Sequence, residues 1–83
     1  MPYRVDWLPG PMAALAHIWN HAVDRQAIAD AANQIDRVLA RTPFTAGAAQ
    51  GSVFRLHIAP LEVIYTVWPA DRRVEVSLVS YRP

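Results

Sequence analysis

Arg55, His57 and Glu62 bring together the three kinds of group that acid–base chemistry at a phosphate requires. Arg55 and His57 are two residues apart, so in a strand their side chains point to the same face. Glu62 follows soon after a turn signal at residues 59 and 60, in the next predicted strand. A carboxylate can act as a base, an imidazole as an acid and a guanidinium as a phosphate clamp. We therefore predict that Glu62 is the base, His57 the acid and Arg55 the clamp of a catalytic site.

The turn between these residues sets the register of a hairpin. Ala59 and Pro60 are the expected turn residues, so the residues that flank them become partners. The predicted pairs are Ile58 with Leu61, Leu56 with Val63 and Phe54 with Tyr65 on the core face, and His57 with Glu62 and Arg55 with Ile64 on the opposite face. The polar groups then share one face of the sheet, and Tyr65 is a packing residue.

A second hairpin extends the candidate site to the last strand. The regular register pairs Trp68 with Arg73, Glu62 with Val79 and Ile64 with Ser77. Tyr81 then lies on the same open face, where its side chain orients a phosphate or stacks on a nucleobase. Arg82 adds a second clamp only if it lies beyond the strand end, because its position in the alternating pattern is that of a core residue.

The same residues also have purely structural interpretations. A cross-strand pair of His57 and Glu62 is an ordinary surface feature worth ~0.2–1 kcal/mol. Trp68 opposite Arg73 fits a cation–π pair at the turn. Three arginines of the longer predicted helix form a solvated face or, as the second interpretation, an interaction surface: Arg25, Arg37 and Arg41.

The elements that position these groups follow from hydrophobic periodicity. Apolar residues recur at three- and four-residue steps from Ile28 to Leu39, which is typical of an amphipathic helix. Asp24 suits its N-cap, and Thr42 before a proline ends it. The other predicted elements are a strand over 3–8, a helix over 11–21, a loop over 45–51, and strands over 52–58, 61–68 and 74–80, the last with Val74, Val76 and Leu78 on one face.

The order β-α-α-β-β-β predicts an α+β fold in a single domain over residues 1–83. The three C-terminal strands form an antiparallel meander. The two helices form a hairpin that buries its apolar stripe on one sheet face, which leaves the other face free.

The composition narrows the function classes. Apolar residues make up 53% of the chain, so it is not a disordered protein. The net charge is +1, without the large basic excess typical of nucleic-acid binders, and all eight basic residues are arginine. The absence of cysteine excludes disulfides and thiolate metal sites.

No signal peptide or membrane span is visible, so a soluble cytoplasmic protein is expected. His17 and His21 lie one helical turn apart but lack a third ligand, so we predict no metal and no cofactor.

Three stretches, taken in order, resemble the RelE/ParE toxin family over nearly the whole chain. The family's opening strand and first helix are resembled by the stretch YRVDWLPGPMAALAHIW of this sequence. Its second helix is resembled by AANQIDRVLARTPF, and its closing meander by VFRLHIAPLEVIYTVWPADRRVEVSLVSYRP. The resemblance implies the toxin of a type II toxin–antitoxin system, with a cognate antitoxin that wraps the toxin. It also implies a homodimer or a hetero-oligomer with the antitoxin, and grooves that accept an extended or helical antitoxin segment.

The family leaves the activity open. RelE-like members cleave mRNA on the ribosome, by attack of a 2′-hydroxyl on the neighbouring phosphate, whereas ParE-like members inhibit DNA gyrase without a nuclease site. Arg82 matches a common arginine of the nucleases, which favours a ribosome-dependent mRNA endonuclease. Glu62 replaces a frequent arginine, and the sequence stops at Pro83 without a further tail. These departures also fit a degenerate, non-toxic member that only binds an antitoxin.

Overall fold

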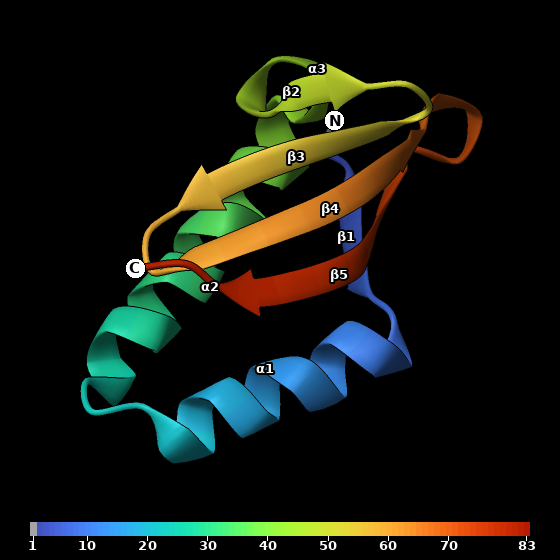
Figure 1. Ribbon diagram of the computed structural model, residues 1–83. Helices are drawn as coiled ribbons and strands as arrows, with labels where there is room; N and C mark the ends of the chain where they lie inside the picture. The colour runs from blue at the N-terminus through green and yellow to red at the C-terminus, as the bar shows by residue number, and fades with distance from the viewer. Residues whose placement is uncertain (1) are drawn as a thin grey trace.

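The computed structural model describes residues 2–83, which form a mixed five-stranded sheet and two main helices (Figure 1). The elements are β1 (Arg4–Trp7), α1 (Pro9–His21), α2 (Arg25–Arg41), α3 (Pro43–Ala46), β2 (Ala48–Gln50), β3 (Val53–Ile58), β4 (Leu61–Trp68), the 3-10 turn η1 (Pro69–Asp71) and β5 (Arg73–Tyr81). The strand order is β1-β5-β4-β3-β2. β1 runs parallel to β5, and the other neighbours are antiparallel. The predicted α+β fold is confirmed.

Both helices begin where local chemistry favours it. α1 starts at Pro9, two residues before the predicted start, because Leu8 is extended and accepts the Met12 N–H at 3.0 Å. Proline suits this first position, since its missing N–H would have no helical partner. α2 is capped as predicted, with the Asp24 carboxylate accepting the Ala27 N–H at 3.1 Å.

The core lies between the helices and one face of the sheet. α2 contributes the stripe that its periodicity predicts, and β4 and β5 contribute the sheet side. The fully buried large residues are Ile28, Ile35, Leu39, Leu61, Val63, Tyr65, Val74 and Val76. α1 packs against β5 with its half-buried apolar residues, and it diverges from α2 after the short connection between them (Figure 1).

The predicted loop over residues 45–51 is wrong, because α3 and β2 occupy this part of the chain. Tyr65 organises the segment: its hydroxyl donates to the Pro43 carbonyl at 2.7 Å and accepts the Gly47 N–H at 3.0 Å. A Cβ on Gly47 would lie 2.6 Å from the Arg55 carbonyl oxygen, so glycine is required for this close approach. These contacts are tertiary, and local sequence patterns do not report them. The packing role predicted for Tyr65 is confirmed.

The first hairpin has the predicted register, with His57 opposite Glu62 and Phe54 opposite Tyr65. The second hairpin starts as predicted, with Trp68 opposite Arg73, but a β-bulge shifts it by one residue. Ser77 has no partner of its own in β4, and its hydroxyl donates to the Ile64 carbonyl at 3.2 Å.

The bulge reverses which residues at the end of β5 face the core and which face the open side. Val79 is buried and faces Val63, whereas Leu78 is 54% exposed and faces Ile64. The predicted pairing of Glu62 with Val79 is therefore wrong, and Ser80 is the partner of Glu62. The prediction that Leu78 shares a face with Val74 and Val76 is also wrong.

Candidate functional site on the open sheet face

The sheet face away from the helices carries the predicted acid–base cluster at one end. Arg55 and His57 extend from β3, and Glu62 extends from the facing position of β4. The Arg55 Nη1 lies 3.9 Å from the Glu62 Oε1, which is a long ion pair. The Glu62 side chain is 14% exposed and that of Arg55 is 45% exposed. Glu62 therefore lies low on the sheet, and Arg55 reaches across the strands to it.

His57 has a different partner from the one that the register suggests. Its Nε2 lies 2.7 Å from the Arg82 carbonyl oxygen. A carbonyl only accepts, so Nε2 donates, and in a neutral ring the lone pair is on Nδ1. The Arg82 N–H donates to the Pro60 carbonyl at 2.7 Å, which holds the residue beside the β3–β4 turn, where the C-terminus lies in Figure 1. The backbone of Arg82 thereby orients His57.

The structure does not bring Tyr81 into this cluster. Because of the bulge, Tyr81 follows the core-face series of Val79, and it borders a hollow of about 360 Å³ against His17 and His21 of α1. Its predicted place on the open face was wrong. The same shift corrects the expectation for Arg82, whose position continues the open-face series of Leu78 and Ser80.

A second polar cluster, which the sequence analysis predicted only in part, lies at the other end of the open face. The predicted cation–π pair is confirmed, with the Arg73 guanidinium 6.0 Å from the Trp68 ring centroid. Glu75 completes it, because its carboxylate accepts the Trp68 Nε1–H at 2.9 Å and also pairs with Arg73. These two donors, with Trp68 the larger influence, lower the pKa of Glu75. The spacing of Arg73 and Glu75 on one strand face was the available signal.

Three arginines of the open face are balanced by acids, and Arg82 at its end is not among them. Three ion pairs lie on it: Arg4 with Asp6 at 3.1 Å, Arg55 with Glu62, and Arg73 with Glu75. The face is therefore close to neutral, and it differs from the basic footprint of a typical nucleic-acid binder.

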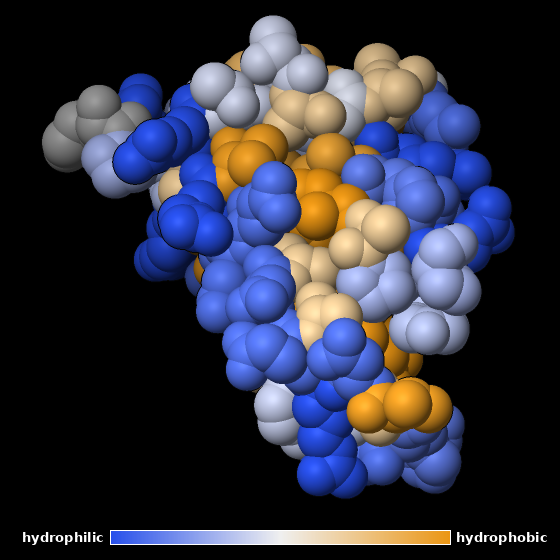
Figure 2. All heavy atoms as spheres, turned by 90° about the vertical axis from the view of Figure 1, so that its left-hand side faces the viewer, coloured by the Kyte–Doolittle hydropathy of each residue, from blue (hydrophilic) through white to orange (hydrophobic). Residues whose placement is uncertain are grey.

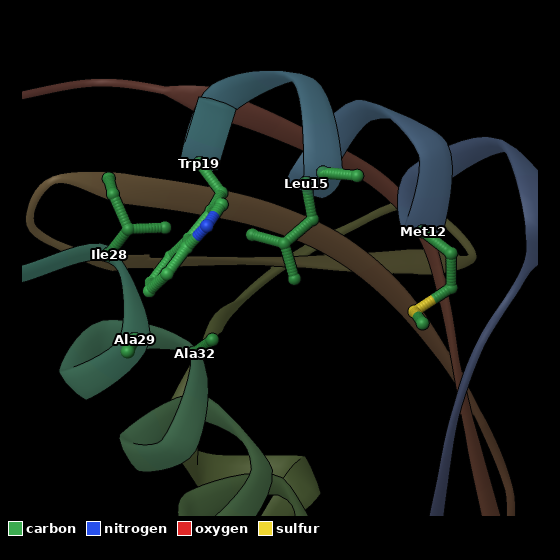
Figure 3. Close-up of a pocket in the computed structure, with 7 residues that line it drawn as sticks. Met12, Leu15, Trp19, Ile28, Ala29 and Ala32 are labelled. Atoms are coloured by element: carbon green, nitrogen blue, oxygen red, sulfur yellow. The ribbon is translucent and has the colours of Figure 1, made fainter. Parts of the chain in front are cut away.

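An apolar groove lies between the two main helices. Met12, Leu15 and Trp19 of α1 face Ile28, Ala29 and Ala32 of α2 around a hollow of about 260 Å³ (Figure 3). Met12 is 53% exposed and Trp19 39% exposed. The Trp19 ring is held by Arg25, whose guanidinium lies 5.9 Å from the ring centroid. The groove gives the molecule an apolar surface at the edge of the core, in which Met12 and Trp19 remain exposed.

Metal-ligand geometry is absent from residues 2–83, in which no three histidine, aspartate or glutamate side chains converge. The His17 and His21 rings lie 4.2 Å apart, and the His21 Nδ1 donates to the His17 carbonyl at 2.9 Å. In the same described stretch, no helix combines the length and apolar character needed to cross a membrane.

The architecture matches solved toxin–antitoxin structures over nearly its full length. A chain of the RelBE2 toxin–antitoxin complex from Mycobacterium tuberculosis superimposes with a TM-score of 0.80 at 16% identity, covering 99% of this chain and 93% of that chain. A chain of the archaeal RelE–RelB complex from Pyrococcus horikoshii gives 0.73 at 18% identity, covering 99% and 97%. The isolated RelE toxin from E. coli gives 0.68 at 13% identity, covering 98% and 85%.

This chain has the RelE fold. Neither models of known families nor curated protein sequences match the chain, so the comparison rests on the solved structures. Within the RelE fold, the acid–base cluster occupies the helix-free face, and the apolar groove occupies the helical side.

Proposed function

We propose that this RelE-like chain is the toxin of a toxin–antitoxin pair and that it cleaves mRNA on the ribosome. The observation that carries the proposal is the meeting of Arg55, His57 and Glu62 at one end of a sheet face that no helix covers. Arg55 supplies a clamp for a phosphate, His57 an acid and Glu62 a base, and all three can reach one reacting group.

The reaction is an internal transesterification of RNA. Glu62 takes the proton of a 2′-hydroxyl, whose oxygen forms a bond to the adjacent phosphorus. The bond from phosphorus to the 5′-oxygen breaks, and His57 in its protonated, imidazolium form gives that oxygen its Nε2 proton and becomes neutral. The products are a 2′,3′-cyclic phosphate and a 5′-hydroxyl, and no metal or cofactor enters the balance. Arg55 stabilises the charge of the phosphate as it changes geometry.

The long Arg55–Glu62 pair suits this sequence of events. The pair is long and its arginine is exposed to solvent, so a bound phosphate can draw Arg55 away at small cost. Glu62 is then free to act as the base. The Nε2 proton of His57 rests on the Arg82 carbonyl and is available for transfer when the leaving oxygen replaces that carbonyl. We therefore assign Arg82 a positioning role through its backbone, and no role to Tyr81.

The antitoxin contact is proposed for the helical groove and the open face. An amphipathic helix that lays its apolar side on Met12 and Trp19 would fill the groove between α1 and α2. A segment across the open face would cover Arg55. The segment on the open face would block the acid–base cluster, and the helix in the groove would anchor the antitoxin to the toxin.

The deciding experiment follows protein and DNA synthesis separately by pulse labelling after induction of the chain in bacteria. An early fall of protein synthesis supports mRNA cleavage, and loss of this effect in H57A and E62Q assigns it to the cluster. An unchanged rate of protein synthesis on induction of the wild type overturns the proposal.

The neutral open face favours a second candidate, inhibition of DNA gyrase by binding alone. RNA affinity rests largely on positive charge that no acid of the protein neutralises. On this face, three arginines are already paired with acids. A protein target does not require that excess. An early fall of DNA synthesis with protein synthesis intact selects this candidate, and absence of any growth defect selects a non-toxic antitoxin-binding chain.

A further inference from the structure

Arg37 and Arg41 differ from most other arginines of the described chain; the side chain of Arg82, at the C-terminal end, is the other one without a hydrogen-bond or ion-pair partner of its own, and only the backbone groups of Arg82 are bonded. Arg4, Arg55 and Arg73 have carboxylate partners, Arg25 donates to backbone carbonyls, and Arg72 lies over the Tyr3 ring. Within residues 2–83, Arg37 and Arg41 have no hydrogen-bond or ion-pair partner. The acids of the same helix are engaged elsewhere, Asp30 by Gln26 and Asp36 by Trp7.

The two guanidinium groups share one exposed site. They lie four residues apart, which places them one above the other on α2, on the side opposite the buried stripe. With Gln34, Val38 and Thr42 they line a hollow of about 370 Å³. Like charges at this spacing destabilise a helix by a few tenths of a kcal/mol, and no acid in the described part of the chain pairs with them.

We propose that Arg37 and Arg41 form a docking site for an acidic segment of a protein partner. Two carboxylates one helical turn apart on the partner match the spacing of the two guanidinium groups. Arginine binds carboxylates in a planar, bidentate manner, and the aliphatic stems with Val38 pack against the partner's methylenes. The site is thus complementary in charge to an acidic amphipathic helix.

A nucleic acid fits this site less well. RNA-binding surfaces are broad and basic, whereas here two arginines stand on a chain with a net charge of +1. The site also lies on the helical side, away from the sheet face that holds the acid–base cluster. α2 occupies the left of Figure 1, and the view from that side shows a hydrophilic band beside an apolar strip (Figure 2). A protein partner can use both kinds of surface at once.

The identity of the partner rests on the proposed function, in which it is the antitoxin. Ile28, Ala29 and Ala32 of α2 line the apolar groove, and Arg37 and Arg41 follow on the same helix. Arg37 and Arg41 lie on a different side of α2 from the groove, so the acidic segment would be a separate part of the partner from the segment that enters the groove.

The test is a titration of the isotope-labelled full chain, followed by the arginine Nε–H signals in NMR spectra. The probe is a short alanine-rich peptide with glutamate pairs one helical turn apart, and the comparison probe is a single-stranded oligouridylate of similar length. We expect the peptide to shift the Arg37 and Arg41 signals and to leave that of Arg4 in place. R37Q should weaken peptide binding about fivefold, as loss of one exposed charge contact predicts.

R4Q is the matched control, since it removes the same charge from the sheet face and should leave peptide affinity unchanged. Shifts of Arg37 and Arg41 with the oligouridylate but not with the peptide would replace the proposal by a nucleic-acid site. Absence of shifts with either probe overturns it. Neither result depends on toxicity, so failure of the proposed toxin function would show separately, as normal growth on induction of the wild-type chain.

Discussion

The two faces of the sheet place polar groups under opposite conditions. On the helical side, Tyr65 is fully buried, and its hydroxyl is satisfied by two backbone partners, Pro43 and Gly47. On the open side, charged groups form ion pairs that no helix covers, and the longest of them joins Glu62 to the 45% exposed Arg55 at 3.9 Å. A buried polar group without partners costs about 1–3 kcal/mol, whereas an exposed ion pair changes stability by about 0–1 kcal/mol. Stability therefore resides on the inner face, and the outer face can change its contacts at little cost.

The largest expected effect separates activity from stability on the open face. H57A and E62Q should each lower the rate of mRNA cleavage about 10²–10⁴-fold, because each removes a group that transfers a proton. The urea midpoint of unfolding should stay close to that of the wild type. T66A, on the same face but away from the cluster, is the control. Cleavage at the wild-type rate by both variants would remove these residues from the site.

The next effect belongs to the inner face. I35A removes a fully buried side chain and should lower the free energy of unfolding by about 2–5 kcal/mol, which is a large share of the stability of a chain of this size. L78A changes an apolar residue that the bulge has turned to solvent and should cost under about 1 kcal/mol. Equal costs in urea unfolding would contradict the bulged register.

Tyr65 allows a smaller and more specific test. Y65F leaves the Pro43 carbonyl and the Gly47 N–H without the hydroxyl, so it should cost about 1–3 kcal/mol in urea unfolding. Burial raises the pKa of Tyr65, and the Gly47 N–H opposes this more weakly. The raised pKa gives stability that is present below the ordinary value of 10.0 and is lost as the pH rises above it.

Y65F should therefore remove part of the alkaline loss of stability, as measured by urea unfolding at rising pH. An alkaline unfolding curve that is identical for Y65F and the wild type would show that the Tyr65 hydroxyl does not ionise on unfolding.

The smallest effect concerns Glu75 on the outer face. Its pKa is lowered by the Trp68 N–H and by Arg73, so its contribution to stability is present above the ordinary carboxylate pKa and fades as the pH falls through the lowered value. W68F should raise the pKa of Glu75 towards its usual range, measured by an NMR titration of the carboxylate carbon. An unchanged pKa would leave Arg73 as the sole cause of the shift.

Sequence reasoning succeeded where local signals decide the structure. The cap at Asp24, the stripe from Ile28 to Leu39 and the turn at Pro60 are all local, and the structure has each of them. The pairing of β1 with β5 and the folding of residues 43–50 depend on contacts between distant segments. The sequence pattern carries no signal for either.

The bulge explains why the site was predicted only in part. Residues on the near side of it, Arg55, His57 and Glu62, lie where the register predicts, because the first hairpin is regular. Beyond Ser77 one extra residue inverts the alternation, so Tyr81 moves to the helical side. Val79 and Leu78 are both apolar, so hydropathy could not show which of them is buried.

The short β2 leaves part of its neighbour open. β2 pairs with β3 only over Val53 to Arg55, and within residues 2–83 the stretch 56–58 has no strand beside it on that side. An unpaired strand edge offers a row of N–H and C=O groups to any extended chain, whatever its side chains. His57 lies within this stretch. An added strand would therefore attach through main-chain hydrogen bonds, which carry no sequence preference, directly beside His57.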